Sequence, residues 1–220
     1  MPVLLDKVSA QIEILRSGDG RLPGLSTGIA DLDKKTTGLH PGDLVIIAGR
    51  PSMGKTSFAL NIAEHCALYE KKAAAVFSME MPAEQLALRL LSSFGRINMG
   101  SLRDGDLSDR DMDRLTSQMG LVREAPLFVD ETGALSPLDL RARARRLKAR
   151  HDIQLIVVDY IQLMQVPGAE NRVNEVSEIS RNLKALAKEL RLPIIALSQL
   201  NRAVAQRDNK RPRMADLRES

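Results

Sequence analysis

One stretch of the sequence constrains the fold more than any other, and it reads Gly49-Arg50-Pro51-Ser52-Met53-Gly54-Lys55-Thr56. It matches the pattern G-x-x-x-x-G-K-[ST], with an apolar run at residues 44–48 before it and an amphipathic helical pattern after it. This context predicts a loop between a strand and a helix, in which backbone N–H groups at the start of the helix bind phosphate. The alternative is a glycine-rich turn without a ligand. The residues expected on one apolar face of that helix are Phe58, Ala59, Ile62, Ala63 and Cys66.

The rest of the chain alternates short apolar runs with longer amphipathic ones. The runs expected to form strands are residues 44–48, 73–77, 127–129, 153–158 and 193–197. Continuous Val, Ile and Leu runs separated by helices are typical of parallel strands covered on both faces. The predicted fold class is therefore α/β, with a mostly parallel, twisted sheet flanked by helices, although the pattern leaves the order of the strands open. Ser136, Pro137 and Asp139 predict the start of a helix that runs to about Arg150.

Composition excludes several classes of protein. The 220 residues, 44% of them hydrophobic, predict one main domain. No apolar run approaches the ~20 residues of a membrane-spanning helix, and the N-terminal residues do not resemble a signal peptide. The single cysteine, Cys66, excludes an intrachain disulfide and predicts a cytoplasmic location. A net charge of +4 permits binding to nucleic acid, and an aromatic content of 3% predicts that such binding would use the phosphate backbone.

Two side chains of the loop are expected to complete a site for a nucleotide. Lys55 would place a positive charge at the β- and γ-phosphates, and the Thr56 hydroxyl would join the coordination shell of Mg²⁺. A nucleotide hydrolase of this kind also requires a carboxylate at the end of a neighbouring strand, to hold the metal through water. Asp159 directly follows the apolar run at 153–158 and is predicted to supply that carboxylate. The alternative interpretation of Asp159 is an ordinary turn residue at the end of a strand.

Two further polar residues follow expected strands at the same edge of the sheet. Glu80 comes just after the run at 73–77 and could orient or deprotonate the attacking water. It could equally be an acidic residue at the N-terminus of the helix that starts near Pro82. Gln199 follows the last apolar run, at the edge where open parallel sheets bind ligands, and its amide could contact the γ-phosphate. A polar residue that merely ends a strand is the alternative for Gln199.

Six strings of residues carry a resemblance to a known family. They are AGRPSMGKT at 48–56, SMEM at 78–81, VVDYIQL at 157–163, VSEISRNLKALAK at 176–188, ALSQL at 196–200 and DLRES at 216–220. Together they resemble the RecA-like motor domain of the bacterial replicative DNA helicase, the DnaB family. The likeness extends from about Leu25 onward. It implies residues 1–24 as a linker helix with a connecting segment, and residues 25–220 as a RecA-like ATPase domain, incomplete at its C-terminus.

The resemblance also implies roles for individual residues. Glu80 matches the catalytic glutamate, Asp159 the aspartate that holds the metal, and Gln199 the γ-phosphate sensor. Arg89, nine residues after Glu80, matches an arginine near that glutamate, although an arginine on an amphipathic helix is usually only solvated. The arginine finger of the family lies downstream of the DLRES string, so no arginine of this chain is assigned that role.

Two segments match the DNA-contacting loops of the family, residues 165–172 and 201–220. A cationic segment without aromatic residues suits a sequence-independent grip on phosphates. The residues predicted to contact DNA are Arg218, Glu219, Arg202, Arg207 and Arg213. The alternative is a solvated or disordered tail. A second basic run, at 141–150, is instead interpreted as a solvated outer helix, with Leu138, Ala142 and Leu147 or their neighbours facing the core.

The resemblance implies an ATP-dependent helicase motor that forms a homo-hexamer on single-stranded DNA, with ATP and Mg²⁺ as cofactors and primase and a helicase loader as partners. Two alternatives stay open. One is a RecA-like recombination or repair ATPase that forms filaments, and the other is a nucleotide-binding scaffold for primase or a loader that does not hydrolyse nucleotide. The apolar positions within residues 4–15 predict a short helix. This helix is expected to pack on another subunit or on a further domain, or else to lie on the local surface.

Overall fold

The structure, a computed structural model, describes residues 22–166 and 171–200 together with positions 5, 6, 8, 9, 12, 13, 16, 211, 213 and 216. Five strands form one sheet in the order β1-β5-β4-β2-β3, and every neighbouring pair is parallel. The strands are β1 (Leu44–Gly49), β2 (Ala74–Ser78), β3 (Leu127–Asp130), β4 (Leu155–Asp159) and β5 (Ile194–Gln199). The predicted parallel α/β sheet is confirmed. Its strand order separates β1 from β4 by β5, the strand that ends in Gln199.

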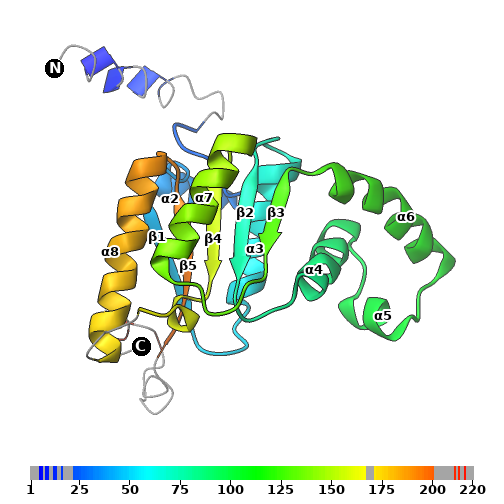
Figure 1. Cartoon of the computed structure of the whole chain (residues 1–220). Coiled ribbons are helices and arrows are strands. Elements are labelled where there is room, and N and C mark those ends of the chain that lie inside the picture. Colours follow the sequence, from blue (N-terminus) through cyan, green and yellow to red (C-terminus); the bar gives the residue numbers. More distant parts are fainter. Residues whose placement is uncertain are drawn as a thin grey trace.

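Helices cover both faces of this sheet (Figure 1). One face is covered by α7 (Pro137–His151) and α8 (Arg172–Leu190), and the other by α3 (Lys55–Leu68). The remaining helices are α2 (Ala30–Thr36), α4 (Ala83–Gly95), α5 (Met99–Asp104), α6 (Asp109–Glu124) and the short 3-10 helix η1 (Ile161–Leu163). Helices α4, α5 and α6 extend to one side of the sheet, and neither α5 nor α6 contains a buried residue.

Two hydrophobic cores lie on opposite faces of the sheet. Because side chains alternate along a strand, Ile156 and Val158 of β4 join the core beneath α7 and α8, whereas Leu155 and Val157 join the core beneath α3. All five residues of β4 are buried, as expected for a central strand of a parallel sheet. The sheet is therefore covered on both faces, and because all of its strands are parallel, their carboxyl ends meet at one edge.

The phenylalanines Phe77 and Phe58 provide a matched test of the core. Phe77 of β2 is fully buried beneath α7 and α8, whereas Phe58 of α3, expected on the apolar face of its helix, is 38% exposed. Phe77→Ala is expected to lower the free energy of unfolding by ~3–5 kcal/mol, because it removes a buried ring and leaves a cavity. Phe58→Ala is expected to cost less than ~1 kcal/mol. Urea unfolding followed by circular dichroism measures both, and equal losses would contradict this packing.

Helix α7 begins as predicted but faces the core with different residues. The Ser136 hydroxyl accepts a hydrogen bond from the Asp139 N–H at 3.1 Å and caps the helix. The buried residues are Leu140 and Ala144, whereas Leu138 is 73% exposed. Positions 140, 144 and 147 share one face because they are spaced by four and then three residues. The predicted core positions of Leu138 and Ala142 are therefore wrong, because both side chains are exposed on a different face of the helix.

Several basic residues of α7, which were predicted to be solvated, form ion pairs with neighbouring elements. Arg141 Nη2 contacts Glu189 Oε2 on α8 at 2.7 Å, and Arg145 pairs with the same carboxylate. Arg143 Nη1 contacts Asp130 Oδ2 at the end of β3, also at 2.7 Å. These ion pairs connect α7 to both of its neighbours, which the sequence pattern did not indicate.

At the N-terminus, the described positions 5, 6, 8, 9, 12, 13 and 16 are helical, in agreement with the predicted short helix. Three apolar residues of this helix, Leu5, Val8 and Ile12, are 62%, 50% and 57% exposed. Residues spaced in this way share one helix face. The described part of the chain therefore leaves this apolar face uncovered.

Candidate active site

The phosphate-binding loop joins the end of β1 to the start of α3. Gly54 precedes the helix with φ of 82°, a left-handed conformation that favours glycine. Helix α3 has no side-chain cap and no acidic residue in its first turn, so its first N–H groups and the positive end of its dipole remain available to an anion. Lys55 Nζ folds back over the loop and donates to the Arg50 carbonyl at 3.1 Å. The loop is thus shaped as an anion site before any ligand is bound.

The register of the sheet places the other predicted residues beside this loop. Gly49 is opposite Gln199, and Ser78 is opposite Asp159. Beyond Ser78, the Met79 N–H donates to the Asp159 carbonyl at 2.8 Å, so the chain leading to Glu80 continues along the same edge. The resulting cleft has a volume of about 510 Å³. The residues that line it are Pro51, Ser52, Gly54, Lys55, Thr56, Ser57, Glu80, Met81, Arg89, Tyr160 and Gln199.

Asp159 lies beneath the cleft and is only 2% exposed. Its Oδ2 atom is buried and has no hydrogen-bond partner among the described residues. Burial raises the pKa of this carboxyl above its ordinary value, although a hydrogen bond from the Thr56 side chain lowers it. The negative charge of Glu80 raises the pKa of Asp159 further, while the positive charges of Lys55 and Arg89 oppose that effect.

This arrangement fits a divalent cation. Mg²⁺ prefers oxygen ligands and usually keeps several waters, so it needs only one or two protein groups. Asp159 and Thr56 would supply these two groups. Asp159 Oδ2 is buried without a partner among the described residues, and the Thr56 hydroxyl, at the end of the phosphate loop, lies beside the same carboxylate. A buried carboxylate is costly unless a cation or a hydrogen bond compensates it, and a metal would do so here.

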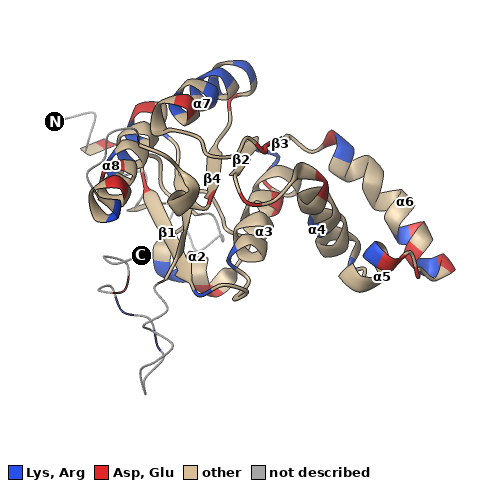
Figure 2. Cartoon of the chain, turned by 60° about the horizontal axis from the view of Figure 1, so that its bottom comes forward, with Lys and Arg blue, Asp and Glu red and all other residues tan. Residues whose placement is uncertain are grey.

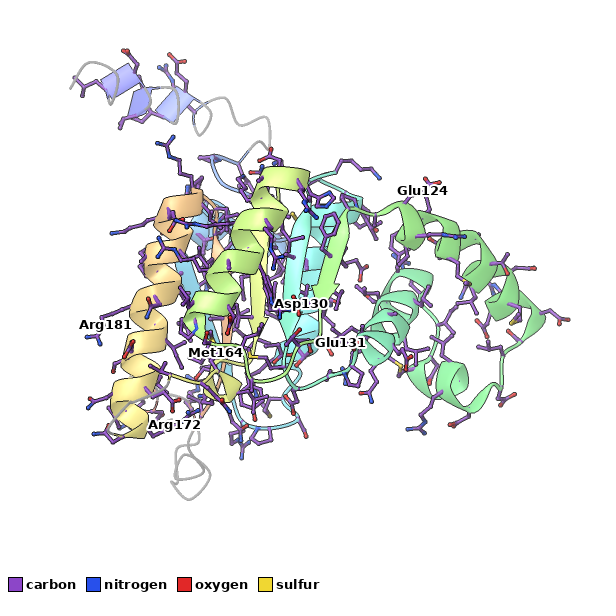
Figure 3. All side chains as sticks on the ribbon, viewed as in Figure 1. Glu124, Asp130, Glu131, Met164, Arg172 and Arg181 are labelled. Carbon is purple, nitrogen blue, oxygen red and sulfur yellow. The ribbon has the colours of Figure 1, made fainter. Side chains whose placement is uncertain are left out.

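Glu80 is exposed at the mouth of the cleft and is not part of a helix. The acidic group that serves the N-terminus of α4 is Glu131, whose Oε2 accepts a hydrogen bond from the Ala83 N–H at 2.5 Å. Figure 3 labels Glu131 just beyond the end of β3, on the side that faces α4. The helix-end interpretation of Glu80 therefore loses its support, because another carboxylate fills that position.

Arg89 of α4 is held by a residue that the sequence did not single out. Its Nη1 donates to Ser57 Oγ at 2.9 Å, and Ser57 directly follows Thr56 in the first turn of α3. Arg89 is half-buried and lines the cleft, so it is not a freely solvated side chain. Because 32 residues separate Ser57 from Arg89, no local pattern could have indicated the pair.

The backbone of Gln199 is held by hydrogen bonds to the side chain of Gln162, in η1. Gln162 Nε2 donates to Ser198 Oγ at 2.9 Å and to the Gln199 carbonyl at 3.1 Å, and its Oε1 accepts from the Gln199 N–H at 3.2 Å. The next residue, Leu200, donates its N–H to the Gly49 carbonyl at 3.1 Å. Sequence reasoning missed Gln162, although it lies in the string that contains Asp159. Met81 and Tyr160 were missed as well.

Four of the five predicted DNA contacts, Arg202, Arg207, Arg218 and Glu219, lie outside the described residues. The fifth, Arg213, is exposed, and its backbone N–H donates to Asp216 Oδ2 at 2.7 Å. Within the described residues no group of three His, Cys, Asp or Glu side chains could hold a metal ion by itself, and no helix is long and apolar enough to cross a membrane.

The fold and this site define the class of the protein. A parallel sheet with a phosphate loop after one strand, and with Asp159 and Gln199 ending two others, is that of a P-loop nucleotide-binding domain of the RecA-like type. The model of the family described as "DnaB-like helicase C terminal domain" matches residues 24–220. The chain belongs to this family.

Several curated relatives are similar to nearly the whole chain. The replicative DNA helicase DnaB of Pasteurella multocida is 50% identical over 223 residues, which covers 99% of this chain and 48% of that protein. That of Buchnera aphidicola subsp. Schizaphis graminum is 48% identical, with the same coverage of both chains. That of Geobacillus stearothermophilus is 50% identical over 95% of this chain and 46% of its own length. The chain thus spans about half the length of these relatives.

Solved structures give the same fold. One of them, described as an ATPase domain, is 33% identical with a TM-score of 0.89, and the match covers 98% of this chain and 77% of that chain. A DnaB-like replicative helicase, solved in a study of its interactions with primase, is 33% identical with a TM-score of 0.88. That match covers 98% of this chain and 52% of the helicase chain.

Proposed function

We propose that this chain is the ATPase motor of a replicative DNA helicase, which hydrolyses ATP to move along single-stranded DNA and unwind the duplex at the replication fork in the bacterial cytoplasm. The observation that carries the proposal is the cleft that joins the phosphate loop to Glu80, Arg89 and Gln199, above the buried Asp159. Membership of the DnaB-like family, with DnaB helicases as relatives, favours this motor over a recombination ATPase.

In this proposal the loop residues 49–56 bind the phosphates through their backbone N–H groups, and Lys55 places its charge at the β- and γ-phosphates. Thr56 and Asp159 would hold Mg²⁺, with Asp159 acting through water. The ion would neutralise charge that develops on the phosphates during transfer. The buried, partnerless Oδ2 of Asp159 supports this assignment.

The remaining cleft residues would act on the attacking water and the γ-phosphate. Glu80 is exposed and faces the cleft, where it would orient the water and accept its proton. Gln199 would contact the γ-phosphate through its amide, from a backbone that Gln162 holds in place. Arg89 would act beside Glu80, positioned by the Ser57 hydroxyl.

The proposed assembly is a homo-hexamer that encircles one DNA strand. The exposed apolar face of Leu5, Val8 and Ile12 supports a contact with another subunit, as the family resemblance implies for this helix. We further propose primase and a helicase loader as partners, because one similar structure is named for its interactions with primase. The division into a linker at 1–24 and an ATPase domain at 25–220 remains part of this proposal.

Steady-state ATP hydrolysis, measured with and without single-stranded DNA over a series of protein concentrations, tests the function. Hydrolysis that rises with concentration and with DNA, and that vanishes in Glu80→Gln, is the expected result. Native mass spectrometry distinguishes a closed six-membered ring from the open-ended series of a filament. Failure to bind nucleotide at any concentration would contradict the motor. Nucleotide binding without turnover would mean that residues completing the catalytic site are not supplied by this chain, as the resemblance implies for the arginine finger, and would leave a nucleotide-binding scaffold for primase or a loader as the alternative.

Ser57→Ala tests the proposed position of Arg89. Loss of the 2.9 Å hydrogen bond should free Arg89 from its place in the cleft and lower kcat by up to about tenfold, the range of one hydrogen bond. The affinity for ADP should stay unchanged, because the hydroxyl points to Arg89. Ser57→Thr keeps a hydroxyl and should restore kcat. Equal losses of kcat in both variants would show that crowding of the helix, and not the hydrogen bond, is responsible.

A further inference from the structure

Strand β3 is an edge strand of the sheet, with β2 on one side and no strand on the other in the described part of the chain. The Ala74 N–H of β2 donates to the Pro126 carbonyl at 2.9 Å. Because alternate residues of a parallel strand face the neighbouring strand, the backbone of Phe128 also faces β2, and that of Val129 faces away from the sheet. Val129 is 37% exposed. The Leu127 N–H, which also faces away from β2, is taken by the Ala125 carbonyl at 2.7 Å, so the N–H and carbonyl of Val129 are the groups that a further strand could pair with.

A groove with a volume of about 420 Å³ lies between this edge and α7. Its apolar floor is formed by Phe128, Val129 and Leu147, and its wall by Arg146, Arg150 and His151 of α7. The His151 ring lies over that of Phe128, with ring centroids 4.2 Å apart. The groove shares no lining residue with the nucleotide cleft, so it is a separate feature of the molecule.

The arginines on the two sides of α7 differ in whether they form ion pairs with carboxylates. On the side toward α8, Arg141 and Arg145 both pair with Glu189. On the side toward the groove, Arg143 is occupied by Asp130, whereas Arg146 and Arg150 are exposed and have no carboxylate partner within the described residues. Figure 2 shows how strongly Lys and Arg gather along this helix. The groove wall therefore carries positive charge that the fold itself does not neutralise.

We infer that this groove binds an extended acidic segment of a partner protein. The segment would add a strand beside β3, with its backbone hydrogen bonds supplying affinity and its side chains supplying specificity. Carboxylates on one face of the segment would meet Arg146 and Arg150, because arginine recognises carboxylates through paired N–H groups. Apolar side chains would contact Phe128 and Leu147. A nucleic acid could satisfy the arginines, but it would leave the strand edge and the apolar floor unused.

The test uses the 220-residue chain and a short fluorescein-labelled peptide of alternating Asp and Val, with binding followed by fluorescence anisotropy. The double variant Arg146→Glu with Arg150→Glu is expected to weaken binding by at least about tenfold, since it replaces attraction by repulsion at two charges. Arg181→Glu is the matched control, because Arg181 is exposed on α8, well away from β3 (Figure 3). It should leave the affinity unchanged.

Backbone pairing is tested separately. The same peptide with alternate backbone amides N-methylated should bind at least about tenfold more weakly, because it loses donors to the strand edge. Val129→Pro removes a backbone donor that faces away from β2 and should also weaken binding. A thermal melt checks that the Val129→Pro variant is folded. If it is not, the N-methylated peptide, measured on the unaltered chain, still tests whether backbone pairing contributes to binding.

Three results would overturn the inference. They are no binding of the peptide, equal binding of the N-methylated peptide, and an unchanged affinity in the double arginine variant. Oligo-dT serves as a competitor in the same assay. If it binds more tightly than the peptide and loses affinity in the arginine variant, the groove wall is a phosphate surface and the proposed peptide site is wrong.

Discussion

Lys55→Ala is expected to abolish ATP hydrolysis and to weaken nucleotide binding by about a hundredfold or more. Charge-assisted hydrogen bonds contribute roughly 1.5–3 kcal/mol each, and a lysine at the β- and γ-phosphates would make more than one. The fold should remain intact, because among the described residues Lys55 Nζ donates a hydrogen bond only to the Arg50 carbonyl of its own loop. Titration with a fluorescent ATP analogue measures the affinity, and a thermal melt measures the stability.

A suitable control for this variant is Lys35→Ala, which removes an exposed lysine from α2, a helix that does not line the cleft. It should bind the analogue as the unaltered chain does. If Lys55→Ala bound nucleotide with unchanged affinity, the phosphate loop would be no more than a glycine-rich turn. The assignment of the whole cleft would then be wrong, because the other residues are interpreted by their distance from this loop.

Glu80→Gln is expected to lower the rate of hydrolysis by about 10²–10⁴-fold, the usual contribution of a general base. Nucleotide binding should persist or tighten. Glu80 raises the pKa of the buried Asp159 carboxyl, so removing the charge of Glu80 makes the ionised form of Asp159 more favourable. An ionised Asp159 is the form that would hold Mg²⁺. Single-turnover hydrolysis and equilibrium binding, measured on the same preparation, separate the two effects.

Glu84→Gln is the matched control, since Glu84 is an exposed glutamate in the first turn of α4, four residues from Glu80. It should retain hydrolysis. A Glu80→Gln variant that turns over at the normal rate would remove Glu80 from the chemistry and leave its place at the mouth of the cleft unexplained.

The sheet and its functional edge follow from local features of the sequence. Each expected strand agrees with an observed one to within two residues, because buried parallel strands are continuous apolar runs. The carboxyl ends of parallel strands share one edge. Residues that follow such runs, among them Glu80, Asp159 and Gln199, were therefore expected beside the phosphate loop before their spatial order was known.

What the sequence could not give depends on contacts between distant segments. The Ser57 hydroxyl reaches Arg89, Glu131 serves the N-terminus of α4, and Glu189 pairs with two arginines of α7. Each of these partners lies 32 or more residues away along the chain. No periodicity within one helix or strand carries such information. The position of β5 between β1 and β4 is of the same kind, since it arises from packing of the whole sheet.

The hydrogen bond from the Leu200 N–H to the Gly49 carbonyl connects the end of β5 to the start of the phosphate loop. Strand β5 ends at Gln199, and the next residue, Leu200, is where the chain leaves the sheet. Leu200 is hydrogen-bonded to Gly49, the last residue of β1 and the first of the phosphate loop. Leu200 is thus joined to Gly49 by one hydrogen bond and to Gln199 by one peptide bond. Within the described residues, no helix lies between the phosphate loop and Leu200. The nucleotide pocket and the point where the chain leaves the sheet are therefore joined directly, by one hydrogen bond and one peptide bond.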